Sequence, residues 1–262
     1  MSANQGEGAV VTGAASGIGR AIAAGLAADG FSIVIADLDE ANGRAAAAEI
    51  GASNKGRTVF HTVDVTDRAS VGAAIEACTR QFGSIKVMVN NAGFNKPEPF
   101  LEASEETWHK IMNVNALGVM IGIQEAAKAM IAKGTKGKII NTASIAGRTG
   151  YAEWAPYCAS KFAVVALTHA GARALAGQGI TVNAFAPGVV ATPLWEQLDK
   201  DLMAMGVSSA PGEAMDNFSK SILLGRVAQP ADVVGTVRFL ASPASDYMTG
   251  QVLMIDGGMI LQ

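Results

Sequence analysis

The sequence predicts a single α/β domain: a doubly wound, parallel, seven-stranded sheet with helices on both faces. Short β-branched runs alternate with alanine-rich amphipathic stretches along all 262 residues, a pattern typical of parallel strands joined by helical crossovers. Half of the residues are apolar, which suits strands that are buried on both faces. No linker or low-complexity tract interrupts the chain, so we expect one domain over residues 1–262.

The expected strands are short apolar runs that end where polar residues or glycines begin. They span residues 9–12, 32–36, 58–63, 87–90, 138–143, 181–186 and 252–255. Residues 20–29 and 41–50 are expected to be helices between the first strands. Because the crossovers share one hand, the carboxyl ends of these strands should meet at one edge of the sheet.

Charge, hydropathy and cysteine content narrow the function classes. A formal net charge of -3 with only 16% charged residues gives no basic surface for nucleic acid or an anionic membrane. The N-terminus MSANQGEG lacks a signal pattern and no run is long and apolar enough to span a membrane, so a cytoplasmic location is expected. Two cysteines and three histidines are scattered without ligand spacing, which predicts neither a disulfide framework nor a metal site.

One segment, at about residues 190–224, shows no steady period. Pro193, Trp195 and Pro211 interrupt it, together with several Met and Gly residues. So long an insertion in a compact domain predicts a lid over a site, with a passive surface excursion as the alternative.

The glycine-rich run TGAASGIG lies between the first expected strand and the first expected helix. Without side chains at Gly13, Gly17 and Gly19, the backbone can approach a pyrophosphate at the helix N-terminus. The spacing is G-x-x-x-G-x-G, and a purely structural turn is the alternative.

Polar residues follow the next three strands. Asp37 stands about twenty residues after the glycines, where a carboxylate can bind an adenine ribose. A helix N-cap is its alternative role. Asp64 ends the third strand, and Asn90-Asn91-Ala92-Gly93 ends the fourth, where they suit either a ribose or adenine contact or a tight turn.

Tyr157 and Lys161, within YCASK, are four residues apart in an expected helix and therefore share one face. A cation beside a phenol lowers the pKa of the phenol from about 10, which predicts a proton donor and acceptor. Ser144 ends an apolar run just upstream. The alternative is an ordinary tyrosine and a lysine that only reaches solvent.

Taken in order, these motifs resemble those of the short-chain dehydrogenase/reductase family over essentially the whole chain. They are TGAASGIG at 12–19, NNAG at 90–93, Asn115, Ser144, YCASK at 157–161 and PGVVATP at 187–193. The resemblance implies a Rossmann-like fold, a flexible substrate lid and a homotetramer.

The resemblance also implies roles for individual residues. Tyr157 would be the general acid/base, Ser144 would hold the substrate oxygen, Lys161 would bind the nicotinamide ribose, and Asn115 would help to keep a water-linked proton path. The implied cofactor contacts are Gly13, Ser16, Gly17, Ile18, Gly19, Asp37, Leu38, Asp64, Val65, Asn91, Ala92, Gly93, Val114, Tyr157, Lys161, Pro187, Gly188, Val190 and Thr192. For the valines and Ile18, simple core packing is the alternative.

The C-terminal third contains the segments GITVNAFAPGVVATPLWEQLD, LGRVAQPADV and LASPASDYMTGQVLMIDGG. Through these segments it resembles the bacterial acetoin/2,3-butanediol and sugar-alcohol dehydrogenases. The expected substrate contacts are Ser144, Ala146, Asn95, Glu153, Trp154, Tyr157 and Trp195. A solvated loop is the alternative for Asn95 and Glu153.

These expectations combine into an NAD-dependent oxidoreductase that interconverts a secondary alcohol of a small polyol, vicinal diol or sugar with its ketone. Asp37 favours NAD because it would repel the extra phosphate of NADP. The second hypothesis is a 3-oxoacyl thioester reductase, which should use NADP and a basic docking surface. A third is a cofactor-binding regulatory protein, which should have lost Ser144, Tyr157 or Lys161.

Overall fold

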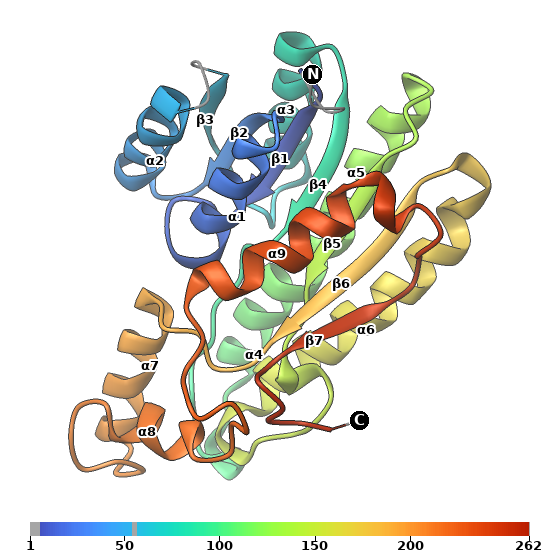
Figure 1. Ribbon diagram of the computed structural model, residues 1–262. Helices are drawn as coiled ribbons and strands as arrows, with labels where there is room; N and C mark the ends of the chain where they lie inside the picture. The colour runs from blue at the N-terminus through green and yellow to red at the C-terminus, as the bar shows by residue number, and fades with distance from the viewer. Residues whose placement is uncertain (1–5, 54–56, 262) are drawn as a thin grey trace.

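A computed structural model describes residues 6–53 and 57–261 and holds one parallel sheet in the order β3-β2-β1-β4-β5-β6-β7 (Figure 1). The strands are β1 Gly8–Thr12, β2 Ser32–Asp37, β3 Thr58–Thr62, β4 Ile85–Asn90, β5 Lys138–Thr142, β6 Thr181–Pro187 and β7 Val252–Ile255. Each expected strand is present within two residues of its expected ends. The predicted fold class is confirmed.

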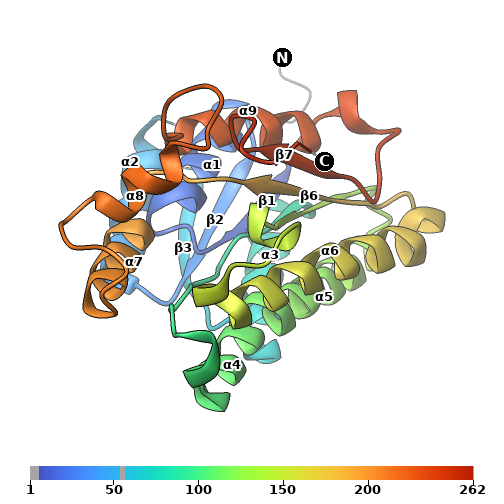
Figure 2. The ribbon, with the colours of Figure 1, turned by 90° about the horizontal axis from the view of Figure 1, so that it is seen from below.

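Helices cover both faces of the sheet, as the turned view shows (Figure 2). Helices α1, α2 and α9 pack on one face and α3, α5 and α6 on the other. Their bounds are α1 Gly17–Ala28, α2 Glu40–Ser53, α3 Arg68–Phe82, α4 Glu105–Met112, α5 Gly118–Ala132, α6 Ala155–Leu175, α7 Pro193–Ala204, α8 Glu213–Ser219 and α9 Pro230–Ala241. Within the described residues no helix is long and apolar enough to cross a membrane.

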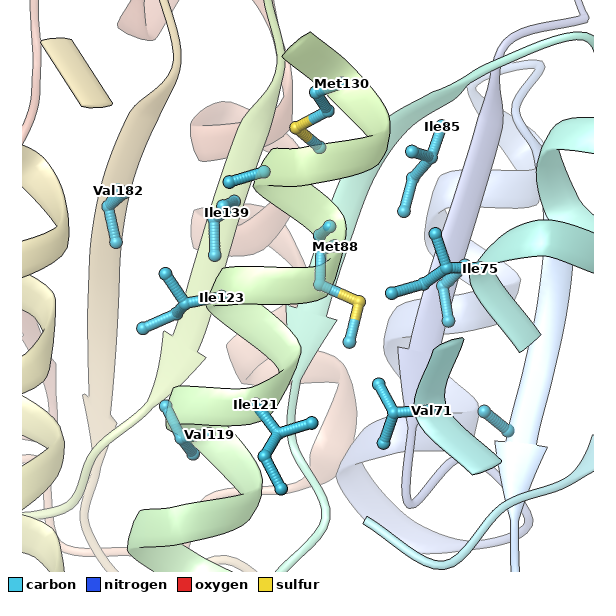
Figure 3. Close-up of a cluster of buried hydrophobic side chains, with 14 of the residues drawn as sticks. Val71, Ile75, Ile85, Met88, Val119, Ile121, Ile123, Met130, Ile139 and Val182 are labelled. Atoms are coloured by element: carbon cyan, nitrogen blue, oxygen red, sulfur yellow. The ribbon is translucent and has the colours of Figure 1, made fainter. Parts of the chain in front are cut away.

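The core consists of two apolar clusters separated by the sheet. In one of them, Ile75 of α3 points towards Met88 of β4 (Figure 3), and Ile121 of α5 belongs to the same cluster. The other fills the space between the sheet and helices α1 and α9. Strands buried on both faces form a rigid platform, so groups at their carboxyl ends are held in fixed positions.

The segment 190–224 contains two helices, so the expectation of an irregular segment is wrong. Pro193 begins α7, since a proline in the first turn needs no N–H. Leu198, Asp199 and Leu202 are its buried residues, and with Trp195 they follow the i, i+3, i+4, i+7 spacing of an amphipathic helix. Helices α7 and α8 lie beyond the carboxyl ends of the strands (Figure 1).

The order of the strands reverses beside β1, which has β2 on one side and β4 on the other. Crossovers leave in opposite directions from this point, so a crevice opens at the carboxyl ends of β1 and β4. The glycine turn after β1 and the Asn90-to-Gly93 run after β4 both lie here.

Candidate active site

Two adjoining hollows lie at the carboxyl edge of the sheet. The first runs between the glycine turn, the ends of β5 and β6, and the start of α7. The second runs between the ends of β2, β3 and β4. Both are lined by Gly13, Ser16, Asn91 and Gly93, so they form one continuous groove, which we call the cofactor groove.

Every residue expected to contact the cofactor lines this groove. The first hollow is lined by Gly13, Ser16, Gly17, Ile18, Gly19, Asn91, Gly93, Tyr157, Lys161, Pro187, Gly188, Val190 and Thr192. The second is lined by Asp37, Leu38, Asp64, Val65, Ala92 and Val114. Sequence reasoning missed further lining residues, namely Thr142, Ala143, Pro193, Leu194, Ala36, Val63 and Phe94. Several of these residues lie next to the motifs named above, and this proximity could have been used to predict them.

The glycine turn is shaped as a cradle for phosphate. Gly13 and Gly17 have φ angles of 64° and 54°, in the left-handed region that favours glycine. A Cβ on Gly19 would lie 2.1 Å from the Gly13 carbonyl oxygen. Ser16 makes no side-chain capping bond, which leaves the first N–H groups of α1 for an anion. The turn therefore fits the pyrophosphate of a dinucleotide.

Asn91 fixes the shape of this turn from the neighbouring strand. Its side-chain amide donates to the carbonyl oxygens of Thr12 at 3.1 Å and of Gly13 at 3.2 Å. Thr142, at the end of β5, donates its hydroxyl proton to the Asn91 Oδ1 at 3.3 Å. A chain of hydrogen bonds thus joins the ends of β1, β4 and β5.

Asp37 faces the second hollow and accepts two backbone hydrogen bonds. Its Oδ2 accepts from the Ala15 N–H at 2.9 Å, and its Oδ1 from the Asp39 N–H at 3.0 Å. Helix α2 is capped by Asp39, which accepts from the Asn42 N–H at 3.0 Å. The alternative role of Asp37 as that helix cap is therefore wrong.

The two arginines nearest to Asp37 in sequence are already paired with carboxylates. Arg20 pairs with Glu49, and Arg44 pairs with Glu40 at 2.7 Å. Neither forms an ion pair with Asp37.

Tyr157, Lys161 and Ser144 meet in the first hollow. Lys161 Nζ lies 5.5 Å from the centre of the Tyr157 ring and donates to the Thr142 carbonyl oxygen at 2.8 Å. Ser144 Oγ accepts from the Ala146 N–H at 3.1 Å, which orients the hydroxyl at the turn after β5. One phenol, one hydroxyl and one ammonium therefore share a single wall of the groove.

Burial, rather than the neighbouring cation, dominates the pKa of this pair. Desolvation raises the pKa of Tyr157 to about 12, and a hydrogen bond with the Ser144 hydroxyl opposes the rise only in part. Desolvation also lowers the pKa of Lys161 to about 8. The expectation that Lys161 depresses the Tyr157 pKa is therefore wrong for the ligand-free chain, because enclosure disfavours both charged forms.

Asn115 lies in a π-helical turn, Asn113–Leu117, between α4 and α5. Its Nδ2 donates to the Phe94 carbonyl oxygen at 2.9 Å and to Ser160 Oγ at 3.1 Å, and its Oδ1 accepts from the Phe94 N–H at 3.0 Å. Ser160 Oγ in turn donates to the Tyr157 carbonyl oxygen at 2.7 Å. The Asn115 side chain therefore fastens α6 to the strand end after β4. The π-helical turn that carries Asn115 is itself of a kind that is frequent at functional sites.

Of the expected substrate contacts, Ser144, Tyr157 and Trp195 line the first hollow. The structure does not bring Ala146, Asn95, Glu153 or Trp154 into the lining of either hollow. Ala146 and Trp154 are buried. Glu153 accepts a hydrogen bond from the Glu98 N–H through its backbone carbonyl oxygen at 3.0 Å.

Tyr151, Trp154, Trp195 and Phe218 form an aromatic cluster beside the groove. Trp154 stacks on Phe218 with ring centres 4.9 Å apart, and Trp195 meets both rings at 6.0 and 5.7 Å. Tyr151 and Trp154 belong to the body, whereas Trp195 and Phe218 belong to α7 and α8. Sequence reasoning missed Tyr151 and Phe218, for which no local pattern gave a signal.

Comparisons with known proteins identify relatives of this chain. A family model described as "Enoyl-(Acyl carrier protein) reductase" matches residues 13–260. An L-2,3-butanediol dehydrogenase of Corynebacterium glutamicum is 47% identical over 96% of this chain and 98% of its own length. A galactitol 2-dehydrogenase of Agrobacterium fabrum is 41% identical over 95% and 96%. A crystal structure of levodione reductase superposes with a TM-score of 0.91 at 32% identity, covering 97% and 98%.

Fold and site together define an oxidoreductase that acts on CH–OH groups with a nicotinamide cofactor. The chain belongs to the short-chain dehydrogenase/reductase family.

Proposed function

We propose that this protein is an NAD-dependent dehydrogenase that interconverts a secondary alcohol of a small diol, polyol or related sugar with its ketone. The observation that carries the proposal is the meeting of Tyr157, Ser144 and Lys161 on one wall of the cofactor groove. The names of the relatives, a butanediol dehydrogenase, an (S)-acetoin-forming diacetyl reductase and a galactitol dehydrogenase, support the substrate class.

Each residue has one task in this chemistry. In the oxidation direction the Tyr157 oxygen takes the proton of the alcohol, and in reduction the same hydroxyl returns it. The Ser144 hydroxyl holds the oxygen that gains or loses this proton. A nicotinamide cofactor, when bound, would supply the hydride chemistry. Lys161 would hold the sugar beside its ring, and Asn115 positions α6 through Ser160.

NAD rather than NADP is the proposed cofactor. The Asp37 carboxylate lies in the wall of the second hollow, where the adenine ribose would bind. Arg20 and Arg44, the nearest cations in sequence, are paired with Glu49 and Glu40. An extra phosphate would therefore meet a negative charge, while these two arginines are already paired with carboxylates.

The compartment and assembly belong to the same proposal. Cys78 and Cys158 are free thiols, which fits a reducing cytoplasm. We also propose a homotetramer, and a lid formed by residues 190–224.

The test is a screen of the purified protein against diols, polyols and sugars with NAD, and against the matching ketones with NADH. We expect turnover of at least one vicinal diol or polyol. Tyr157→Phe should lower that turnover by about 10²-fold to 10⁴-fold while NADH binding persists. Activity on a 3-oxoacyl thioester with NADPH, and on no diol or polyol, would replace the proposal with the thioester reductase. Near-normal turnover by the Phe variant would remove Tyr157 from its role.

A further inference from the structure

Two buried polar atoms beside the aromatic cluster have no hydrogen-bond partner within the part of the chain that the structure describes. They are the indole Nε1 of Trp154, whose residue is 4% exposed, and the Oδ1 of Asp199, whose residue is 8% exposed. One atom is a donor and the other an acceptor. Buried groups of this kind are normally paired, so an arrangement that leaves both unpaired is disfavoured.

The two atoms lie on opposite sides of the contact between the lid and the body. Trp154 is in the short helix Ala152–Trp154 just before α6. Asp199 lies on the buried face of α7 between Leu198 and Leu202, which pack in the same cluster as Trp154. Because the two groups belong to different sides of this contact, a movement of α7 relative to the body would change their separation.

Asp199 also joins the two lid helices. Its Oδ2 accepts from the Gly212 N–H at 2.7 Å, directly before α8. Because Phe218 of α8 stacks on Trp154, α7 and α8 are linked both to each other and to the body. They should therefore move as a unit.

The start of α7 is part of the cofactor groove. Pro193, Leu194 and Trp195 line the first hollow, and Asp199 follows Trp195 by one helical turn. A ligand that fills the hollow touches the same helix that carries Asp199. Binding there is therefore coupled to the position of the unpaired carboxylate oxygen.

We propose that Asp199 is a positioning residue, which accepts a hydrogen bond from the Trp154 indole N–H when the α7–α8 unit closes over the loaded groove. The bond joins lid to body and holds Trp195 against the reacting centre. This inference rests on the proposed function only for the substrate used in its kinetic test.

Ser208 offers a competing partner for Asp199. Its hydroxyl is also buried and unpaired among the described residues, and it lies in the connection between α7 and α8. A bond from Ser208 would stay within the lid and would not join it to the body. The experiment has to separate these two donors.

The first measurement is a double-mutant cycle on kcat/KM with Asp199→Asn and Trp154→Phe. The amide removes the charge and keeps one acceptor oxygen, which the Gly212 N–H requires, so that its NH2 group faces the indole N–H. The phenyl ring keeps the stacking but loses the donor. We expect each single variant to lose about tenfold in kcat/KM and the double variant to lose about tenfold as well. Asp201→Asn, which alters a carboxylate that pairs with Gln197 at the surface of α7, and Trp108→Phe, which alters an exposed tryptophan outside the cluster, should remain within about twofold of wild type. Losses that multiply to about a hundredfold, or a cycle that couples Asp199 to Ser208→Ala instead, would overturn the proposal.

The second measurement needs no substrate. The Trp154 indole N–H signal, assigned by its loss in Trp154→Phe, is followed by NMR in protein with ¹⁵N-labelled tryptophan. We expect a downfield shift on saturation with NADH in the wild type and no such shift in Asp199→Asn. An unchanged signal, or the same shift in both proteins, would refute the latch.

The same double-mutant cycle on the thermal stability of the ligand-free protein distinguishes a purely structural contact. Such a contact would make the effects of the two substitutions non-additive, whereas we expect their effects on stability to add. If the wild type turned over no diol or polyol, the proposed function would fail, while the NADH titration would still decide the latch.

Discussion

At the scale of single residues, enclosure decides the chemistry of the catalytic pair. An ammonium and a phenol lie side by side, yet both pKa values move towards neutral groups. Sequence spacing predicted the pair correctly but gave the wrong direction for the tyrosine, because desolvation depends on the packing of α6 against β5. Spacing along a helix carries no information about that packing.

Lys161 therefore makes stability depend on pH. Its pKa is about 8 in the folded chain, whereas an unfolded lysine has a pKa of about 10.4. Between these values the unfolded state binds more protons, so the free energy of unfolding should rise with pH, by up to about 3 kcal/mol. This contribution is present above the unfolded pKa and is lost as the pH falls through about 8.

In Lys161→Met, the free energy of unfolding should not rise with pH in this way. Urea unfolding of the ligand-free protein at pH 7.5 and 9.5, at one protein concentration, measures the pH dependence of that free energy. Lys128→Met, which removes an exposed lysine paired with Glu125, is the matched control and should keep the wild-type slope. Equal pH slopes for wild type and Lys161→Met would show that the ammonium is not desolvated.

Asp37 should set the choice of cofactor. Two unit charges about 4 Å apart at an effective dielectric constant near 20 repel by roughly 4 kcal/mol, about a thousandfold in preference before screening. We expect wild type to prefer NAD strongly, Asp37→Ser to weaken that preference, and added Leu38→Arg to shift it further towards NADP. Steady-state kinetics with both cofactors measure this.

Asp39→Ser provides the control for this experiment. It removes the same charge two residues away, from an exposed side chain that caps α2 and does not line the groove. It should lower stability slightly and leave the cofactor ratio unchanged. Equal or better efficiency of wild type with NADP would reject the role of Asp37.

At the scale of elements, the proposed lid separates what the sequence could predict from what it could not. The interruption of the regular pattern at residues 190–224 was visible from Pro193 and Pro211, but helices α7 and α8 were hidden by the intervening Met and Gly residues. The buried spacing of Leu198, Asp199 and Leu202 was present in the sequence. This spacing did not identify an amphipathic helix clearly, because Asp199 is charged and stands at a buried position. The contacts of Trp195 with Trp154 and Phe218 join distant segments, which no local pattern reports.

Helices α7 and α8 should exchange their amide hydrogens faster than the sheet until ligands bind. They extend beyond the sheet, and α8 has Ala214 as its only buried residue among those described, so local opening should cost little. We expect slower exchange on addition of NADH and a substrate, measured by mass spectrometry. Helix α5, packed against the sheet, is the internal reference. Exchange in α7 and α8 as slow as in β5, and unchanged by ligands, would contradict the assignment of a lid.

At the scale of the whole molecule, the strands of the sheet were predictable because each is a short apolar run. Such a run can be recognised from the local sequence alone, without knowledge of the neighbouring strand. The parallel direction of the strands followed from the expected helical crossovers between them. Subunit contacts do not follow in this way, since they depend on which surfaces remain uncovered once the chain has folded.

Two such surfaces lead to the prediction of a homotetramer. Strand β7 is an edge of the sheet, with all four residues partly exposed and one side unpaired within the described chain. Open edges of this kind invite pairing with another subunit. On the opposite helical layer, Phe162 of α6 is 47% exposed, and Trp108 and Ile131 are also exposed. A closed tetramer with dihedral symmetry needs two distinct faces, each of which pairs with its own copy, and these two surfaces are the candidates.

Sedimentation at micromolar concentration should therefore show a species of about four times the 26.8 kDa chain mass. Phe162→Glu should convert it to dimers, because a carboxylate at the centre of an apolar contact has no partner there. Val207→Glu, which alters an exposed apolar residue between α7 and α8, should leave the tetramer intact. Monomers alone in the wild type would rule out the assembly. A tetramer that survives Phe162→Glu would show that the α6 face is not one of its interfaces.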